Sequence, residues 1–263
     1  MRPAPRSRRF ALVGAVCAGL VVGGAGLTAC GGGGGGGEDP DAGTNGVGKL
    51  SAARIQSKAR QVAEAAPAVR LSGTVVSKGH TYKLDMRLTH NGGTGTVTSK
   101  GGTFELLRVD RNLYLKADAA FWAHKEEGAG GAGGPGGTGG ADGAAAAKLD
   151  GKYVKVPQGD PAYRRLSGFT DKGVLLDGTL ALHGTLAKGE RGGTGAKRFI
   201  RISGDKGAGG TLEVSLKGKP YPLTLRRAGG TGTLRLSEWG QLVPLREPDK
   251  GETVDYGQQL PTS

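Results

Sequence analysis

The residues of this sequence that could do chemistry are few and scattered. Its four histidines, His80, His90, His124 and His183, each lack a partner at metal-ligand spacing, so no zinc site is expected. There is no G-x-S-x-G elbow and no H-E-x-x-H motif, and the glycine-rich stretch 192–197 lacks the spacing of a phosphate loop. The sequence therefore predicts no enzyme, no metal and no cofactor.

The charged residues give no catalytic pair either. Asp85, Glu105 and Glu213 fall between basic residues on the polar side of predicted strands, where a solvated charge pattern is the usual explanation. Aromatic residues make up 5% of the chain, which is too few for the stacking platform of a single-strand nucleic-acid binder. No nucleic-acid partner is expected.

Cys30 is the one nucleophilic side chain in an informative context. It ends the lipobox Leu27-Thr28-Ala29-Cys30, which follows several arginines and an apolar run over residues 10–26. This order is typical of a bacterial export signal and resembles the substrates of signal peptidase II. We expect diacylglycerol on the thiol, removal of residues 1–29, and anchoring of the acylated Cys30 at the outer face of the cell membrane.

An uncleaved membrane anchor is the alternative, because residues 10–29 are about long enough to span a bilayer. Such an anchor would not need a cysteine directly before the glycine run 31–37. The export route stays open, since Ser7-Arg8-Arg9 matches a twin-arginine signal only in part. Cleavage would also remove Cys17, which leaves Cys30 without a disulfide partner.

Cleavage removes four arginines, so the formal net charge of +13 becomes +9. A basic balance outside the cell fits attraction to anionic lipid headgroups or acidic wall polymers. Composition then divides the mature chain into a lipidated flexible tether (30–48), a domain (49–256) and a tail (257–263). Within the domain, the Gly/Ala tract 128–143 is predicted to be a mobile loop.

Two helices are predicted in the domain. Leu50–Ala66 carries apolar residues at Ile55, Ala59 and Val62 and stops before Pro67, which indicates an amphipathic helix with a thin, alanine-rich face. A second helix is expected around Asp171–Leu182, although Gly173 and Gly178 weaken it. Its apolar contacts would come from Val174, Leu175, Leu180 and Leu182.

The rest of the domain alternates between apolar and polar residues, as strands with one buried face do. Turn residues at hairpin spacing separate about nine or ten such runs and predict one antiparallel meander. The runs are 69–77, 81–89, 94–99, 104–109, 112–116, 152–156, 197–203, 212–217, 223–226 and 233–236.

Strand phase selects the residues of the apolar face, which are candidates to line a ligand cavity. They are Tyr82, Leu84, Met86, Leu88, Leu106, Leu113, Leu115, Leu212, Val214, Leu216, Leu223 and Leu225. A register slip of one residue would swap the two faces. Two thin helices could cover this face and leave a cavity, but a tight core of Leu and Val explains the same pattern, so both interpretations stay open.

The order of these features resembles the LppX/LprG (LprAFG) family of actinobacterial lipoproteins. Besides the lipobox and the first helix, the segments that carry the resemblance are 69–75, 82–88, 112–117 before Phe121-Trp122, 149–157 and 236–240. The resemblance covers nearly all of residues 50–250, and Gly128–Gly143 departs from it. It implies an α+β fold, a curved antiparallel β half-barrel with helices packed on its concave face, similar to LolA/LolB and RseB-like proteins.

The resemblance also implies that acyl chains are held in the cavity. We therefore expect a non-enzymatic carrier that lifts lipid or glycolipid from the membrane and passes it to a membrane transporter or acceptor protein. The alternative is a surface sensor or interaction module that binds an acylated protein or a membrane signalling partner.

Overall fold

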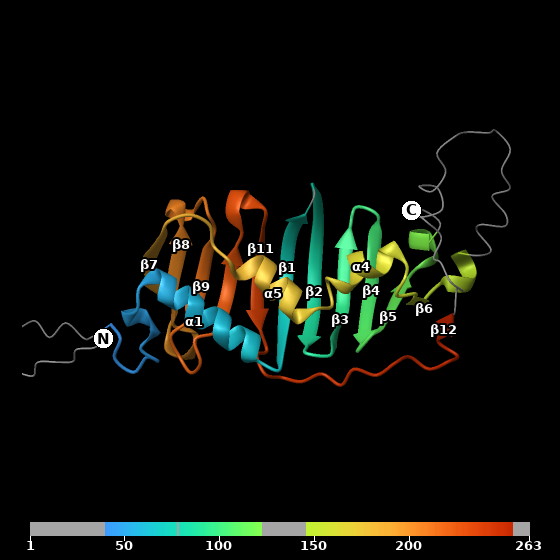
Figure 1. Ribbon diagram of the computed structural model, residues 1–263, viewed down its shortest axis with the longest axis horizontal. Helices are drawn as coiled ribbons and strands as arrows, with labels where there is room; N and C mark the ends of the chain where they lie inside the picture. Colours follow the sequence, from blue (N-terminus) through green and yellow to red (C-terminus); the bar gives the residue numbers. More distant parts are fainter. Residues whose placement is uncertain (1–39, 78, 123–145, 255–263) are drawn as a thin grey trace, which may run out of the picture. The chain divides into compact units, whose positions relative to one another are not determined.

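Twelve strands form one open sheet in the described part of the computed structural model, residues 40–77, 79–122 and 146–254 (Figure 1). Their order across the sheet is β12-β6-β5-β4-β3-β2-β1-β11-β10-β9-β8-β7. The strands are β1 (Ala68–Ser77), β2 (His80–Thr89), β3 (Gly92–Ser99), β4 (Gly102–Val109), β5 (Asn112–Ala117), β6 (Tyr153–Val156), β7 (Leu186–Gly192), β8 (Phe199–Gly204), β9 (Thr211–Ser215), β10 (Pro222–Arg226), β11 (Gly232–Ser237) and β12 (Thr253–Val254).

The sheet consists of two meanders rather than the single meander that the turn spacing predicts. One runs from β1 to β6 and the other from β7 to β11, and the antiparallel pairing of β1 with β11 joins them at the middle of the sheet. All neighbours are antiparallel except β12 and β6, which pair in parallel. The α+β class is confirmed, whereas the half-barrel curvature stays a prediction.

Three helices lie in a row across one face of the sheet (Figure 1), which we call the inner face. They are α1 (Ala52–Ala65), α4 (Pro161–Ser167) and α5 (Lys172–Leu180), and together they form the helix cover. Residues 119–122 and 146–149 are also helical. The 3-10 turns are η1 (Val47–Lys49), η2 (Gly195–Lys197), η3 (Asp205–Gly207) and η4 (Ala228–Gly230).

Each helix of the cover begins at a side-chain cap. The Ser51 hydroxyl accepts from Arg54 N at 3.4 Å, and the Asp171 carboxylate accepts from Val174 N at 3.0 Å. The Asp160 carboxylate caps α4, with Pro161 in its first turn, a position where proline loses no helical hydrogen bond. The predictions of α1 and α5 are confirmed, but α4 was missed although the Asp160-Pro161 pair signals it.

The structure differs from the sequence predictions at two further places, and each difference has a local cause. Val174 was expected to supply an apolar contact but is 60% exposed, and Leu176 is buried in its place. Strand β7 was missed because its Lys, Glu and Arg side chains are mostly exposed and do not alternate. It is one of the two edge strands of the sheet, and charged side chains on an edge strand discourage pairing with other chains.

The folded part of the chain begins earlier than composition suggests. Residues 40–48 were expected to belong to the tether, but Asn45 Nδ2 donates to the carbonyls of Ser215 at 2.9 Å and Gly218 at 3.1 Å. Val47 is buried in the core. These contacts across the chain fix a segment whose composition alone resembles a linker. Cys30, the stretch 31–39, the Gly/Ala tract 128–143 and the tail 257–263 lie outside the described residues.

After β11 the chain runs back along one end of the strands in segment 240–252, which contains no helix or strand and which we call the strap (Figure 1). Glu247 anchors it, because its carboxylate accepts from Asn112 Nδ2 and, at 2.9 Å, from the Tyr114 hydroxyl. Burial, and next the bond to Glu247, raise the pKa of Tyr114 from 10.0 to about 12. These bonds also hold the pKa of the Glu247 carboxyl below its usual range.

The Tyr114 shift predicts a loss of stability in strong base. The raised pKa belongs to the folded state. The contribution of neutral Tyr114 to the unfolding free energy is therefore complete below pH 10 and is lost as the pH rises towards about 12. The difference in unfolding free energy between the wild type and Tyr114→Phe should therefore shrink over this range, by on the order of 2 kcal/mol. Urea unfolding at a series of pH values measures it, and two parallel pH profiles would contradict the assignment.

No helix in the described residues is both long enough and apolar enough to cross a membrane.

Candidate functional site: the inner face and its helix cover

The strand register brings the predicted lining residues together on the inner face. Directly paired residues share a face of a sheet, and one such row runs from Leu71 through Met86, Gly95, Leu106 and Leu115 to Val154. A neighbouring row of cross-strand pairs contains Leu84. In the second meander, Leu212 pairs with Leu225. The alternation in the sequence therefore identifies the correct face.

Two of the twelve candidates differ from the rest. Leu223 is half-buried, because the register shifts between Pro222 and Thr224 and places it in a β-bulge. Tyr82 is also half-buried, and its ring lies 5.5 Å from that of Phe169 at a tilt of 53°. Strand phase alone could not reveal the bulge, because it depends on the partner strand.

The other ten candidates are core residues in this structure. They are Leu84, Met86, Leu88, Leu106, Leu113, Leu115, Leu212, Val214, Leu216 and Leu225, each 1% exposed or less. A side chain without accessible surface borders no space that a water molecule could enter. The inner face and the helix cover are thus packed against each other, and an acyl chain could enter only by displacing the cover.

The helix cover contributes few large apolar side chains to the core. The residues that α1 buries are Ala52, Ile55, Ala59 and Ala63, so three of the four are alanines. Helix α5 buries Leu176 and Leu180, but its nine residues include Gly173 and Gly178, each of which costs about 1 kcal/mol of helix propensity. The cover therefore consists of short helices with small side chains.

Polar contacts tie α5 to α1 at several points. The side chain of Lys172 is buried, and its Nζ donates to the carbonyls of Glu64 at 2.7 Å and Ala66 at 2.6 Å. These carbonyls lie at the C-terminal end of α1, which has no helical donors for them and carries the negative end of the helix dipole. Burial lowers the pKa of Lys172. Further along, Arg60 Nη2 lies 3.0 Å from the Asp177 carboxylate.

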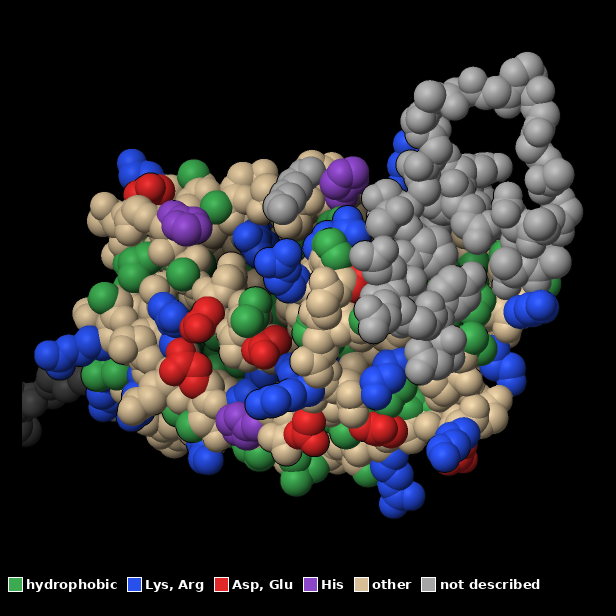
Figure 2. Space-filling view, turned by 45° about the vertical axis from the view of Figure 1, so that its right-hand side comes forward, with side chains coloured by type: hydrophobic (Ala, Val, Ile, Leu, Met, Phe, Trp, Pro, Cys, Tyr) green, Lys and Arg blue, Asp and Glu red, His purple; other side chains and the backbone are tan. Residues whose placement is uncertain are grey.

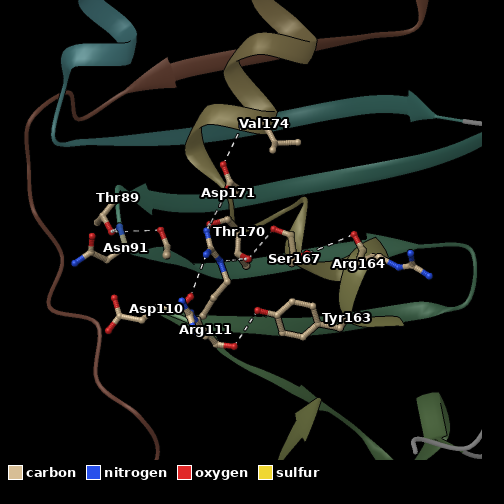
Figure 3. A network of polar contacts seen from close by, with 12 residues as sticks. Thr89, Asn91, Asp110, Arg111, Tyr163, Arg164, Ser167, Thr170, Asp171 and Val174 are labelled. Carbon is tan, nitrogen blue, oxygen red and sulfur yellow. Dashed lines mark hydrogen bonds and ion pairs between the residues drawn. The ribbon is translucent and has the colours of Figure 1, made fainter. Parts of the chain in front are cut away.

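Arg108 on β4 ties the sheet to the junction of α4 and α5. Its Nε donates to Thr170 Oγ1 at 3.0 Å, and its Nη2 donates to the Thr170 carbonyl at 3.0 Å and to Asp171 at 3.2 Å. Figure 3 shows Thr170 and Asp171 beside the turn that carries Asp110 and Arg111. Arg108 was not predicted as a site residue, although a charged side chain in phase with Phe104 and Leu106 is a signal.

The outer face of the sheet carries a group of ion pairs. Arg70 donates to both carboxylate oxygens of Asp85, at 2.9 and 2.7 Å, and to Glu238 at 2.9 Å. The bonds from Arg70 hold the pKa of Asp85 below its usual range. Figure 2 views the molecule from the side of the helix cover, where basic, acidic and hydrophobic side chains are interspersed.

The histidines do not meet in the described chain. His80 begins β2, His90 follows it, and His183 lies beyond α5, while His124 is outside the described residues. No group of three or more His, Cys, Asp or Glu side chains among the described residues could hold a metal ion.

Two hollows of the described surface have none of the ten core candidates in their lining. One of about 600 Å³ lies beside the strap, and one of about 540 Å³ lies beside α1. Leu225 borders a much smaller hollow, of about 30 Å³, near His183.

An open antiparallel sheet with one aliphatic face under three short helices defines the class of this protein as an α+β fold with a thinly covered sheet. No family model matches the chain, and no curated protein matches it. Among solved structures it is similar to LprF from Mycobacterium bovis, with 15% identity over 75% of this chain and 96% of that chain and a TM-score of 0.47.

The chain is also similar to the lipoprotein LppX from Mycobacterium tuberculosis, with 13% identity over 74% of this chain and 100% of that chain and a TM-score of 0.41. Both proteins are members of the LppX/LprG lipoprotein family, the family that the sequence features resemble.

Proposed function

We propose that this protein is an extracytoplasmic lipoprotein of the LppX/LprG family, anchored to the outer face of the cell membrane by acylated Cys30. It binds the acyl chains of a lipid or glycolipid between the inner face and the helix cover and carries them from the membrane to an acceptor. The observation that carries this proposal is the aliphatic inner face, which continues across both meanders under three short helices.

An acyl chain suits this face by its chemistry. The face presents aliphatic side chains in cross-strand rows, and removing an apolar chain from water yields roughly 25 cal/mol per Å². Several kcal/mol of binding free energy follow for a long chain, which holds it while permitting release. The protein therefore acts by binding rather than by catalysis.

Displacement of α5 is the step that would open the site. Its two glycines give it little intrinsic helix stability, and its buried Leu176 and Leu180 occupy the positions that an acyl chain would take over the sheet. An acyl chain replaces the apolar contacts of these two leucines with similar ones, so the cost of opening is partly offset. Arg108 would keep the N-terminal end of α5 attached to β4.

The tight packing of the inner face against the helix cover favours a second candidate function. A surface module that needs no cavity would bind an acylated protein or a membrane signalling partner through its exterior. It makes the opposite prediction about bound lipid, so one experiment separates the two functions.

The experiment is extraction of bound lipid from protein made in its native host. Residues 39–263, which form one compact unit, are exported behind a cleavable signal, purified, extracted with organic solvent and analysed by mass spectrometry. We expect acyl lipid from the wild type. Ala59→Phe, on the buried side of α1, should reduce it about tenfold, because overpacking costs about 1–3 kcal/mol.

Ala53→Phe is the matched control, since Ala53 lies on the exposed side of the same helix, and it should retain the lipid. Circular dichroism confirms that both variants fold. Repeated preparations of wild-type protein without lipid would rule out the carrier function and leave the interaction module.

A further inference from the structure

The hollow beside the strap and the hollow beside α1 lie at the same end of the strands, which we call the strap edge. It is the edge at which β1 begins and at which β2 and β4 end. The register of β1 with β11, and of β10 with β9, places the β9–β10 connection at this same edge. In Figure 1 the strap runs along it.

The hollow beside α1 combines an apolar floor with a basic rim. Its lining includes Val47, Leu50 and Val62, with Lys58 and Lys219 exposed beside them. No Asp or Glu belongs to this lining. An apolar groove with two ammonium groups and no carboxylate suits an acyl chain with a negatively charged headgroup.

The hollow beside the strap carries an exposed apolar side chain. Leu242 is 70% exposed, and Val243, Pro244 and Leu245 follow it along the strap. Arg246 comes next and is exposed, as is Arg111 in the β4–β5 turn. Asp110 and Glu247 lie here too, but Glu247 is bound by Asn112 and Tyr114.

The described chain also begins at the strap edge. Arg198, which directly precedes β8, donates to the carbonyl of Pro40 at 2.6 Å and to that of Ala42 at 3.2 Å. Ten residues, 30–39, separate Pro40 from a start at Cys30. They span at most about 35 Å when extended, so an anchor at Cys30 holds this edge near the membrane surface.

We propose that the strap edge is the surface with which this protein docks onto an anionic phospholipid bilayer. Leu242 and its apolar neighbours enter the headgroup boundary, the groove beside α1 takes an acyl chain, and Lys58 and Lys219 contact phosphate groups. The proposal rests on the proposed membrane location of the protein but does not require a lipid on the inner face.

The test is co-sedimentation of residues 39–263, which lack Cys30 and thus any covalent lipid, with vesicles. We expect binding to vesicles of phosphatidylglycerol and phosphatidylcholine in equal parts and much weaker binding to pure phosphatidylcholine. Lys58→Gln and Lys219→Gln should each weaken binding about fivefold, because a cation near an anionic surface contributes about 1 kcal/mol. Leu242→Ala should weaken it about tenfold through lost apolar burial.

Matched controls come from elsewhere on the domain. Lys100 and Lys206 are exposed in turns at the opposite edge, and Val174 is exposed on α5, so Lys100→Gln, Lys206→Gln and Val174→Ala should bind as the wild type does. The proposal would be overturned if the control substitutions weakened vesicle binding as much as the strap-edge substitutions do. It would also be overturned if the protein showed no preference for anionic vesicles. If vesicles bind but no lipid is extracted from the native protein, docking stands and the carrier function fails.

Discussion

Lys172→Met should destabilise the protein by about 2–3 kcal/mol. Methionine fills the space of the lysine stem, but it cannot donate to the carbonyls of Glu64 and Ala66, which Lys172 holds at 2.7 and 2.6 Å. An acceptor left without a donor away from water costs about 1–3 kcal/mol. Removing the cost of burying the ammonium, which lowers its pKa, offsets part of this loss.

Urea unfolding followed by circular dichroism measures the change. Lys206→Met, at an exposed lysine, is the control and should stay within about 0.5 kcal/mol of the wild type. Since Lys172 ties the start of α5 to the end of α1, the variant should also bind a fluorescent apolar dye more strongly, as the cover loosens. A Lys172→Met protein as stable as the control would show that the contact does not hold the cover.

Gly95→Ala should destabilise the protein by about 4 kcal/mol. Gly95 lies in β3 opposite Met86 and has a φ of +153°, which L side chains rarely adopt. A Cβ there would lie 2.1 Å from the Asp85 carbonyl oxygen and 2.9 Å from Met86 Sδ. Backbone strain and overpacking each contribute about 1–3 kcal/mol.

Gly159→Ala is the matched control, because a Cβ there would meet no atom within 4 Å, and it should change stability by less than about 0.5 kcal/mol. Thermal unfolding of the two variants compares them directly. A Gly95→Ala protein with wild-type stability would mean that β2 and β3 separate at this point without cost. It would also mean that the inner face is less tightly packed than the burial of Met86 indicates.

Local patterns in the sequence were sufficient for most of the helices and strands and for the apolar face. The alternation from Tyr82 to Leu88 placed Leu84, Met86 and Leu88 on one side of β2, where the structure has them. Helix α1 followed from its helix formers and from Pro67. These predictions succeed because side-chain direction in a strand or helix depends on the period of the backbone alone. The lipobox at Cys30 is equally local and stays a prediction.

Contacts between distant segments could not be read from such patterns. Lys172 meets α1 more than 100 residues away, and Arg108 meets Thr170 across 62 residues. The bulge at Leu223 exists only relative to β9. Residues 40–48 look like a linker by composition, and only their contacts with distant segments, such as the bonds from Asn45 to Ser215 and Gly218, show that they are folded.

The sequence by itself determined that one face of the sheet is aliphatic and that few helices are available to cover it, because both follow from local periodicity. Only the tertiary structure decided that the two meanders join at β1 and β11 and that the ten core residues are almost completely buried beneath the helix cover. Packing depends on how side chains from distant segments fit together, and no local period records that fit.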